Sequence, residues 1–159
     1  MELTFWLRME GFSFQSISRW SAVDRQAYLD FAADEIDRQL GSAWNSPLVS
    51  AGFVPFDGAL EVSFEWFLND YGLPRGLTHE LNVGDLDNVC KSLLDRFQSR
   101  AFKDDKQIVR LVMSKRSIKA INLSEPSRTP TRIMQALRGV KDHSTDLLYF
   151  RVSQLETHL

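Results

Sequence analysis

The chain has 159 residues, 43% of them hydrophobic and 25% charged, so it can close one hydrophobic core and leaves little room for a second independent domain. Its single cysteine, Cys90, excludes an intrachain disulfide and a zinc site built from cysteines. No apolar run approaches the ~20 residues of a membrane-spanning helix and the first residues lack a basic leader, so we expect a cytoplasmic protein with no membrane association.

The first half of the chain predicts two strands and one helix. Apolar and polar residues alternate over 2–9 and again over 60–68, which is the periodicity of a strand with one buried face. Between them, residues 21–40 repeat apolar positions at helical spacing, with Ser21 as a capping residue at the start and Gly41 as a stop signal.

The second half predicts two helices and two strands. A helix from Asp85 to about Arg100 would bury one apolar side, which consists of Leu86, Val89, Cys90, Leu93, Leu94 and Phe97. A strand over 108–113 follows, then a short helix over 131–141 and a closing strand over 148–152. The short helix would bury Ile133, Met134, Leu137 and Val140. This order of elements predicts an α+β fold, with one compact domain over 1–159 and helices packed on a mixed sheet.

Acidic residues gather at the start of the helix that begins at Asp85. Asp87 and Lys91 are four residues apart and therefore neighbours on the helix surface, and Asp85 lies just before the first turn, where free backbone N–H groups favour a carboxylate. Two or three aspartates, completed by waters and phosphate oxygens, are a typical Mg²⁺ site. The spacing suggests a divalent-metal site for Mg²⁺, or Mn²⁺ in its place, with Asp104 or Asp105 as the inferred third ligand.

Two simpler interpretations of the same residues stay open. Asp85 would serve as a helix cap alone, and Asp87 with Lys91 would form an ion pair on a solvent-exposed helix face.

A longer run of residues extends the pattern: Asp85-Leu86-Asp87-Asn88-x-x-Lys91, then Leu94-Asp95, then Asp104-Asp105-x-Gln107-Ile108-Val109. At these residues the chain resembles the RusA family of Holliday junction resolvases, which are small Mg²⁺-dependent endonucleases. The resemblance implies that the metal-binding and catalytic residues are Asp85, Asp87 and Asp105, with Lys91 as an active-site lysine. It also implies cleavage of four-way or other branched DNA, a RusA-like fold, a homodimer, and a family-variable basic insertion over 115–145 before the last strand.

Lysine and arginine are concentrated in one segment. Residues 115–141 contain seven of them and one acidic residue, whereas the first 114 residues are acidic overall. Such a block can supply phosphate contacts that position DNA without reading its sequence, although a solvated basic face is an equally good interpretation. The candidate DNA-binding residues, in this segment and beside the aspartates, are Lys103, Lys106, Arg110, Lys115, Arg116, Arg132, Arg138 and Lys141.

These patterns support three classes of function. The first is an Mg²⁺-dependent, structure-specific endodeoxyribonuclease, in which the metal would activate water and Lys91 would stabilise developing negative charge. The second is a RusA-like nucleic-acid-binding protein that has lost cleavage, and the third is a protein-interaction module that uses the acidic face of residues 24–37. We expect most aromatic residues in the core, which leaves base stacking by Trp6, Trp20 or Trp44 as the less favoured interpretation.

Overall fold

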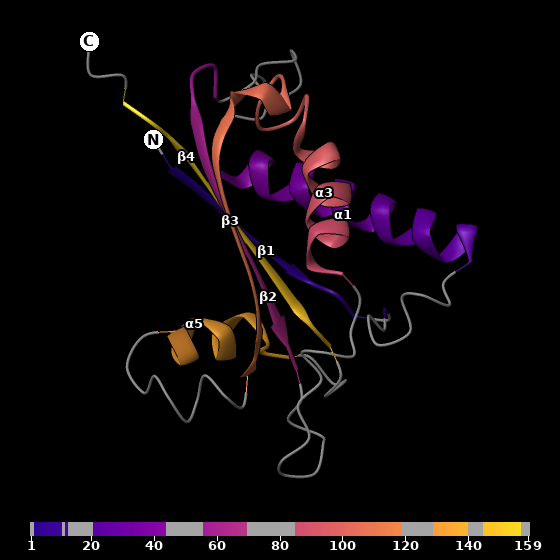
Figure 1. Cartoon of the computed structure of the whole chain (residues 1–159). Coiled ribbons are helices and arrows are strands. Elements are labelled where there is room, and N and C mark those ends of the chain that lie inside the picture. Colours follow the sequence, from indigo (N-terminus) through magenta and orange to yellow (C-terminus); the bar gives the residue numbers. More distant parts are fainter. Residues whose placement is uncertain are drawn as a thin grey trace.

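The computed structural model describes residues 2–10, 12, 21–43, 56–69, 85–118, 129–139 and 145–156. Its centre is a mixed sheet of four strands in the order β1-β4-β2-β3. The strands are β1 (Glu2–Arg8), β2 (Leu60–Leu68), β3 (Ile108–Ser117) and β4 (Leu147–Gln154). β4 is antiparallel to both of its neighbours, whereas β2 and β3 run parallel, so β1 and β3 form the two edges of the sheet (Figure 1).

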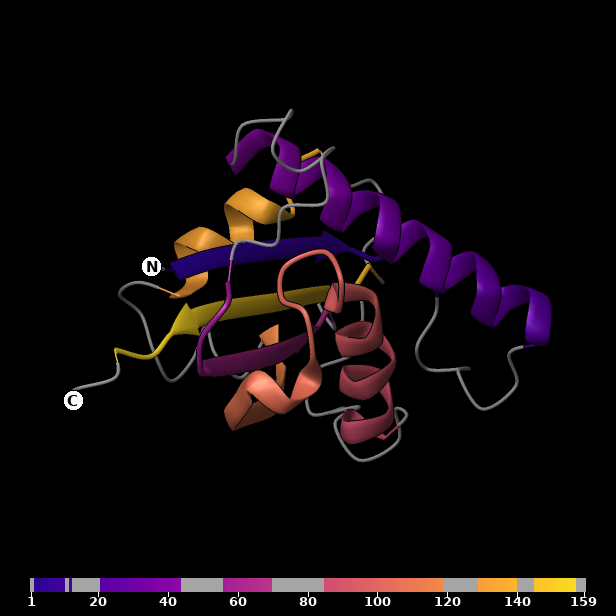
Figure 2. The same ribbon diagram turned by 90° about the horizontal axis from the view of Figure 1, so that it is seen from above.

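Helices cover the two faces of the sheet unequally. α1 (Ala22–Ala43) and α3 (Leu86–Phe97) pack on one face, and the short α5 (Thr129–Ala136) packs on the other (Figure 2). A 3₁₀ turn, η2 (Asp105–Gln107), leads into β3. These elements confirm the predicted α+β fold with helices packed on a mixed sheet. None of the helices in the described ranges is both long and apolar enough to cross a membrane.

An aromatic cluster fixes α3 against the sheet. Phe97 at the end of α3 meets Phe5 of β1 edge to face, with ring centroids 4.9 Å apart, and lies 4.7 Å from Phe150 of β4. Phe150 in turn stacks on Phe64 of β2 at 4.6 Å, and all four rings are buried. Such aromatic pairs contribute about 0.5–1.5 kcal/mol each beyond the area that they bury. The cluster therefore holds α3 in one orientation, with Cys90 buried on its inner side as predicted.

The two edges of the sheet differ in their cover. Beside β1, the Gln39 side chain of α1 accepts a hydrogen bond from the backbone N–H of Trp6 (3.1 Å) and donates one to its carbonyl (2.7 Å). No strand among the described residues pairs with the outer edge of β3. β3 instead presents an open edge with exposed large apolar side chains, namely Val109, Leu111, Val112 and Met113.

Three helices end at residues other than those predicted. α1 continues through Gly41 to Ala43, because Gly41 does not adopt the left-handed conformation that commonly ends helices. Among the described glycines only Gly139 has a positive φ, of 82°, and it lies in the turn that follows α5. α5 accordingly ends at Ala136, and α3 ends at Phe97, three residues before the predicted boundary.

β3 is longer than predicted, and α5 buries fewer residues. β3 extends past Met113 to Ser117, because its parallel pairing with β2 continues along the whole of β2. On α5, Ile133 is buried as predicted, but the prediction that Met134 is buried is wrong, since this side chain is 51% exposed. Met134 follows Ile133 by one position, about 100° around the helix, and so points away from the sheet. Val140 lies outside the described residues.

Candidate active site

The start of α3 carries the acidic residues that the sequence singled out. Asp85 is the N-cap residue, with φ −68° and ψ 124°, and Asp87 lies in the first turn. Val89 and Cys90 are buried on the side of α3 that faces the sheet, which turns the opposite side of the helix toward solvent. Two carboxylates and one ammonium group are therefore exposed together at one end of a well-anchored helix, on Asp85, Asp87 and Lys91.

Neither of the simpler uses of these residues is present. The Asp85 carboxylate makes no capping hydrogen bond and instead accepts one from the side-chain amide of Asn88 at 3.3 Å. Asp87 and Lys91 form no ion pair, with each other or with any other residue, in the described part of the chain. The helix-cap and ion-pair interpretations therefore do not describe these contacts, and the three charged groups are open to a ligand.

The turn after α3 uses its two aspartates differently. The Asp104 carboxylate caps η2 by accepting a hydrogen bond from the backbone N–H of Lys106 at 2.9 Å. This bond, with a smaller contribution from Asp105, holds the pKa of Asp104 below its usual value. Asp105 itself is exposed and forms no ion pair within the described ranges. Of the two candidates for a third metal ligand, Asp105 is the one whose carboxylate does not cap η2, and it lies against the Asp104 side chain.

Gln107 holds this turn in place. Its side-chain oxygen accepts hydrogen bonds from the backbone N–H groups of Lys103 (2.8 Å) and Asp104 (3.0 Å). Its side-chain nitrogen donates to the carbonyls of Phe56 (3.2 Å) and Gly58 (3.0 Å), in the segment that leads into β2. One half-buried side-chain amide thus fixes the backbone around Asp105 without using the Asp105 carboxylate.

Asp105 does not lie beside Asp85 and Asp87 within the single chain. α3 has 12 residues and so spans about 18 Å, with its start at one end and η2 beyond the other (Figure 1). In the described ranges, no three acidic, histidine or cysteine side chains lie close enough together to hold a metal ion. The described chain brings Asp85, Asp87 and Lys91 together and leaves Asp105 apart.

The basic residues near η2 differ in how far they are already engaged. Lys103 and Lys106 are exposed on either side of Asp105 and form no ion pair in the part of the chain that the structure describes. Arg110 pairs with Glu61 of β2 at 3.0 Å, although its side chain is 68% exposed. Of the predicted phosphate contacts near η2, the two lysines are therefore the more available.

Two further predicted contacts lie toward the end of β3. Arg116 pairs with Glu65 at 2.9 Å, and its guanidinium lies 6.0 Å from the centroid of the Phe67 ring. The Lys115 ammonium lies 5.5 Å from the centroid of the Trp66 ring. Both basic side chains are half-buried and already engaged by side chains of the sheet, so they are less available to a ligand than Lys103 and Lys106.

The rest of the basic segment divides between α5 and the turn after it. Arg132 on α5 and Arg138 in the turn are exposed, and the Arg138 carbonyl accepts a hydrogen bond from the Arg8 guanidinium at 3.1 Å. Lys141 lies outside the described residues. The described part of 115–141 therefore supplies positive charge at two places, the end of β3 and α5.

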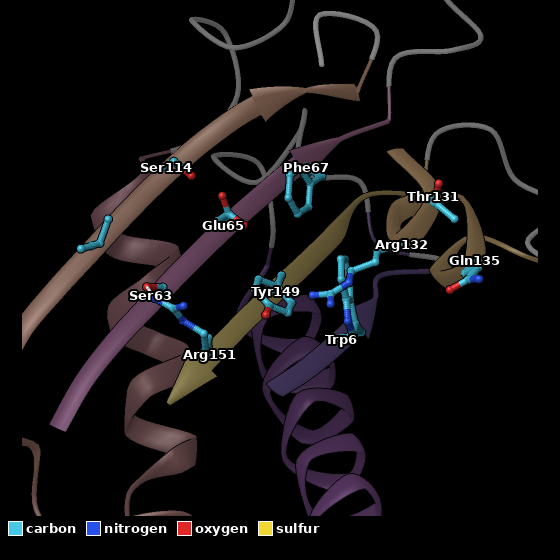
Figure 3. Close-up of a pocket in the computed structure, with 11 residues that line it drawn as sticks. Trp6, Ser63, Glu65, Phe67, Ser114, Thr131, Arg132, Gln135, Tyr149 and Arg151 are labelled. Atoms are coloured by element: carbon cyan, nitrogen blue, oxygen red, sulfur yellow. Dashed lines mark hydrogen bonds between the residues drawn. The ribbon is translucent and has the colours of Figure 1, made fainter. Parts of the chain in front are cut away.

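The sequence analysis did not identify an open pocket on the face of the sheet that carries α5 (Figure 3). This pocket has a volume of about 830 Å³, and its lining includes Trp6, Tyr149, Arg132 and Arg151. Arg151 was not predicted because it alternates with the buried residues of β4, such as Phe150, which carry the strand signal. The signal that could have found it is the period of two, which puts polar residues between the buried ones on the opposite face.

Comparison with known proteins bears on the sequence resemblance. No curated protein matches the chain significantly. A family model does match, over residues 18–124, which is more than half of the chain and includes α1, β2, α3, η2 and β3. That family is described as endodeoxyribonuclease RusA.

Proposed function

The chain belongs to the RusA family of endodeoxyribonucleases, and on that premise we propose that it hydrolyses phosphodiester bonds in Holliday junctions or other branched DNA. The observation that carries the proposal is the set of exposed charges at the start of α3. Among the residues that the structure describes, Asp85, Asp87 and Lys91 make none of the cap or ion-pair contacts that would explain them structurally. Charged groups held on a rigid helix are suited to a metal ion and a phosphate group.

The carboxylates fit Mg²⁺, because this hard cation binds a few carboxylates and completes its shell with waters and phosphate oxygens. Asp85 and Asp87 would hold it, and Mn²⁺ would serve in its place. When bound, such a metal supplies a water of lowered pKa and polarises the scissile phosphate. Lys91 would set its ammonium against the phosphate oxygens, where negative charge grows during attack. Lys103 and Lys106 would hold the flanking backbone.

A second copy of the chain would pair with the open edge of β3 and give the homodimer. An edge strand of ten residues with four exposed large apolar side chains is a place where another strand pairs. A two-fold contact uses the same patch on both copies, so the two β3 strands would run antiparallel. Two active sites related by symmetry suit paired cuts in a four-way junction.

The same pairing would bring the third carboxylate to the metal. α3 and β3 run in opposite directions, so the start of α3 lies toward the end of β3 that is far from η2 (Figure 1). A two-fold axis between the midpoints of the two β3 strands places the beginning of one strand beside the end of the other. The partner's η2 would therefore approach the end at which Asp85 and Asp87 lie, and Asp105 of one copy would join the aspartates of the other.

Mixed dimers test this arrangement. Asp87→Asn and Asp105→Asn, each as a homodimer, should lose Mg²⁺-dependent cleavage of a four-way junction. A dimer of one Asp87→Asn copy and one Asp105→Asn copy, isolated through two different affinity tags, should recover nicking, because one of its two sites carries no substitution. If each site were built within one chain, both sites would carry a substitution and the mixed dimer would be inactive. If both homodimers cleave as fully as the wild type, the assignment of Asp87 and Asp105 as metal ligands is wrong.

The nearest rival is a family member that binds DNA without cutting it. The separation of Asp105 from the other aspartates within one chain favours this rival. Purified protein is incubated with four-way, forked, single-stranded and duplex DNA, with Mg²⁺, with Mn²⁺ and without metal. Metal-dependent products from branched DNA support the nuclease, and binding without product under every condition selects the rival. Action on DNA is also our reason to place the protein in the cytoplasm.

A protein-interaction role for the acidic face of α1 has less support. Asp37 pairs with Arg100 at 2.8 Å, and Glu35 pairs with Arg38 on the same helix. Asp24 is engaged as well, because it exchanges hydrogen bonds with Ser21 at the start of α1. Several carboxylates that would form the contact surface are therefore already used within the chain.

A further inference from the structure

The face of the sheet opposite α1 and α3 is covered only in part by the described elements. α5 packs over one end, where Ile133 joins Phe67 and Leu147 in a small buried cluster. The remainder opens into the pocket of about 830 Å³, with side chains of all four strands on its floor and α5 as its wall (Figure 3). This volume is in the range of sites for small molecules and cofactors.

Two aromatic rings form an apolar part of this pocket. The Trp6 and Tyr149 rings lie 4.5 Å apart between centroids, at an angle of 44°, and Phe67 stacks near Trp6 at 6.1 Å. Both Trp6 and Tyr149 are half-buried and line the pocket, so the rings are supported by neighbours while part of their surface remains accessible. Supported, accessible rings of this kind are the surfaces on which unpaired bases stack.

Two arginines flank these rings. Arg132 extends from α5 toward Trp6 and Tyr149, as Figure 3 shows, and forms no ion pair with any described residue. Arg151 of β4 uses one terminal nitrogen to contact Glu61 (3.2 Å) and the Ser63 hydroxyl (3.3 Å). An arginine carries five N–H donors in a planar fork, so both side chains can bind phosphate oxygens.

The polar floor completes the chemistry of the pocket. Ser63 and Ser114 present hydroxyl groups, and Glu65 presents a carboxylate that is already oriented by Arg116 at 2.9 Å. Hydroxyls and a carboxylate can pair with the edge of a base, which carries both donors and acceptors. Rings, cations and hydrogen-bonding groups thus converge in one cavity from separate parts of the chain.

We propose that this pocket binds a single unpaired nucleotide, with its base on Trp6 and Tyr149 and its phosphate between Arg132 and Arg151. That this nucleotide belongs to a DNA strand rests on the proposed function. The nucleotide would be one that is unpaired at the branch of the DNA substrate. A base inside a continuous duplex is stacked on both sides and cannot offer a face to the rings. The pocket would therefore help the protein to distinguish branched from continuous DNA.

Binding is measured in EDTA, so that the test does not depend on cleavage. The probes are dAMP, a short oligothymidylate, a duplex with one bulged nucleotide, and the same duplex without the bulge. The wild type should bind the bulged duplex at least about tenfold more tightly than the continuous one, and binding should quench tryptophan fluorescence. Trp6→Phe keeps an aromatic ring for packing and should lose most of this quenching. Equal affinity for both duplexes, or undiminished quenching in Trp6→Phe, overturns the proposal.

Charge variants with a matched control distinguish binding in the pocket from nonspecific electrostatic attraction of DNA. Arg132→Glu should weaken oligothymidylate binding by about tenfold or more. Arg25→Glu makes the same change at an exposed arginine of α1, on the other side of the sheet, and should weaken binding by less than about twofold. Tyr149→Leu should weaken binding without changing the salt dependence, since stacking releases no counterions. Equal losses in Arg132→Glu and Arg25→Glu overturn the proposal, and thermal unfolding checks that each variant folds.

The remaining outcomes identify the occupant. Binding of dAMP as tight as that of the oligothymidylate supports a site for a free nucleotide, and much weaker binding of dAMP supports a strand. Competition by a phosphotyrosine peptide at the same concentration as the oligothymidylate overturns a nucleotide site, because the pocket would then fit a protein ligand. If the pocket variants still cut junctions and bind the oligothymidylate as tightly as the wild type, the pocket proposal is wrong and the nuclease proposal stands. If binding depends on the pocket residues but the protein cuts no DNA, the pocket proposal stands and the nuclease proposal is wrong.

Discussion

Gln39 of α1 and Trp6 of β1 are joined by two hydrogen bonds, one from the Trp6 N–H to the Gln39 oxygen and one from the Gln39 nitrogen to the Trp6 carbonyl. The side-chain amide takes the place that a neighbouring strand would occupy. The chain therefore blocks the middle of one sheet edge and leaves the other edge, β3, without a partner strand among the described residues. This asymmetry favours a closed dimer through β3 over an open-ended row of sheets.

Charges placed on the edge of β3 should break the dimer. The wild type should sediment with about twice the mass of one 18.3 kDa chain. Val109→Lys combined with Leu111→Lys should give a mass near that of one chain, because burying two lysines at the contact is costly. Val23→Lys, at a side chain of α1 that is 78% exposed, is the control and should leave the mass unchanged. A wild type that sediments as a single chain would contradict the dimer.

Lys91→Ala should lower the single-turnover rate of junction cleavage by about 10²-fold or more, the scale of losing one group that stabilises an oxyanion. DNA affinity should change much less. Because Lys91 is exposed and makes no ion pair in the described part of the chain, the unfolding temperature should stay nearly constant. Lys103→Ala is the control, and should weaken binding more than it slows turnover. Loss of stability with no loss of rate would restore a purely structural role for Lys91.

Replacing Lys103 and Lys106 together by alanine should reduce the slope of log K against log salt by about two units, since each phosphate contact contributes about 0.9. Arg110→Ala should reduce it by less than one unit, because Glu61 already neutralises part of that charge. The slopes are measured by fluorescence anisotropy without divalent metal. An unchanged slope in the double variant would exclude these lysines from the DNA surface.

Folding should protect the Cys90 thiol. Burial, with a smaller contribution from the negative charge of Asp87, raises the pKa of Cys90 to about 12. An unfolded thiol has a pKa of about 8.5, so this contribution to stability is complete below pH of about 8.5 and is lost as the pH rises toward about 12. The native protein should resist a thiol reagent at about pH 8 and react once unfolded. Between about pH 9 and 11, the free energy of unfolding should fall less in Cys90→Val than in the wild type. Equal losses in the two proteins would contradict the raised pKa of Cys90.

The buried side of most elements could be predicted from the sequence, because burial follows local periodicity, and Met134 of α5 is the exception. Trp66 and Cys90 are in the core as expected, and the bounds of β2 agree with the prediction. The ends of elements were less predictable because they depend on neighbours that are distant in sequence. Pairing with β2 carries β3 beyond Met113, and the helical conformation persists through Gly41.

The candidate site was predictable where one element carries it. Asp85 is the N-cap residue of α3, Asp87 lies in its first turn and Lys91 lies one turn further, and spacing alone predicts this arrangement. The place of Asp105 depends on the chain that returns from α3 to β3, and a third ligand beside the other two was not found within the described chain. No local pattern joins Arg132 to Arg151 either, because they meet only after α5 packs on the face of β4.

The central position of β4 governs when the protein can fold. β4 lies between β1 and β2 although it follows the other three strands in the chain, and Glu2 and Ser153, which are 151 positions apart, are register partners. During synthesis, β1 therefore stays unpaired until residues 147–154 have left the ribosome. Such long-range pairing slows folding, and the waiting chain exposes apolar strands to aggregation and proteolysis. Translation that stops before β4 would leave an unfolded fragment for degradation rather than a shortened but folded domain.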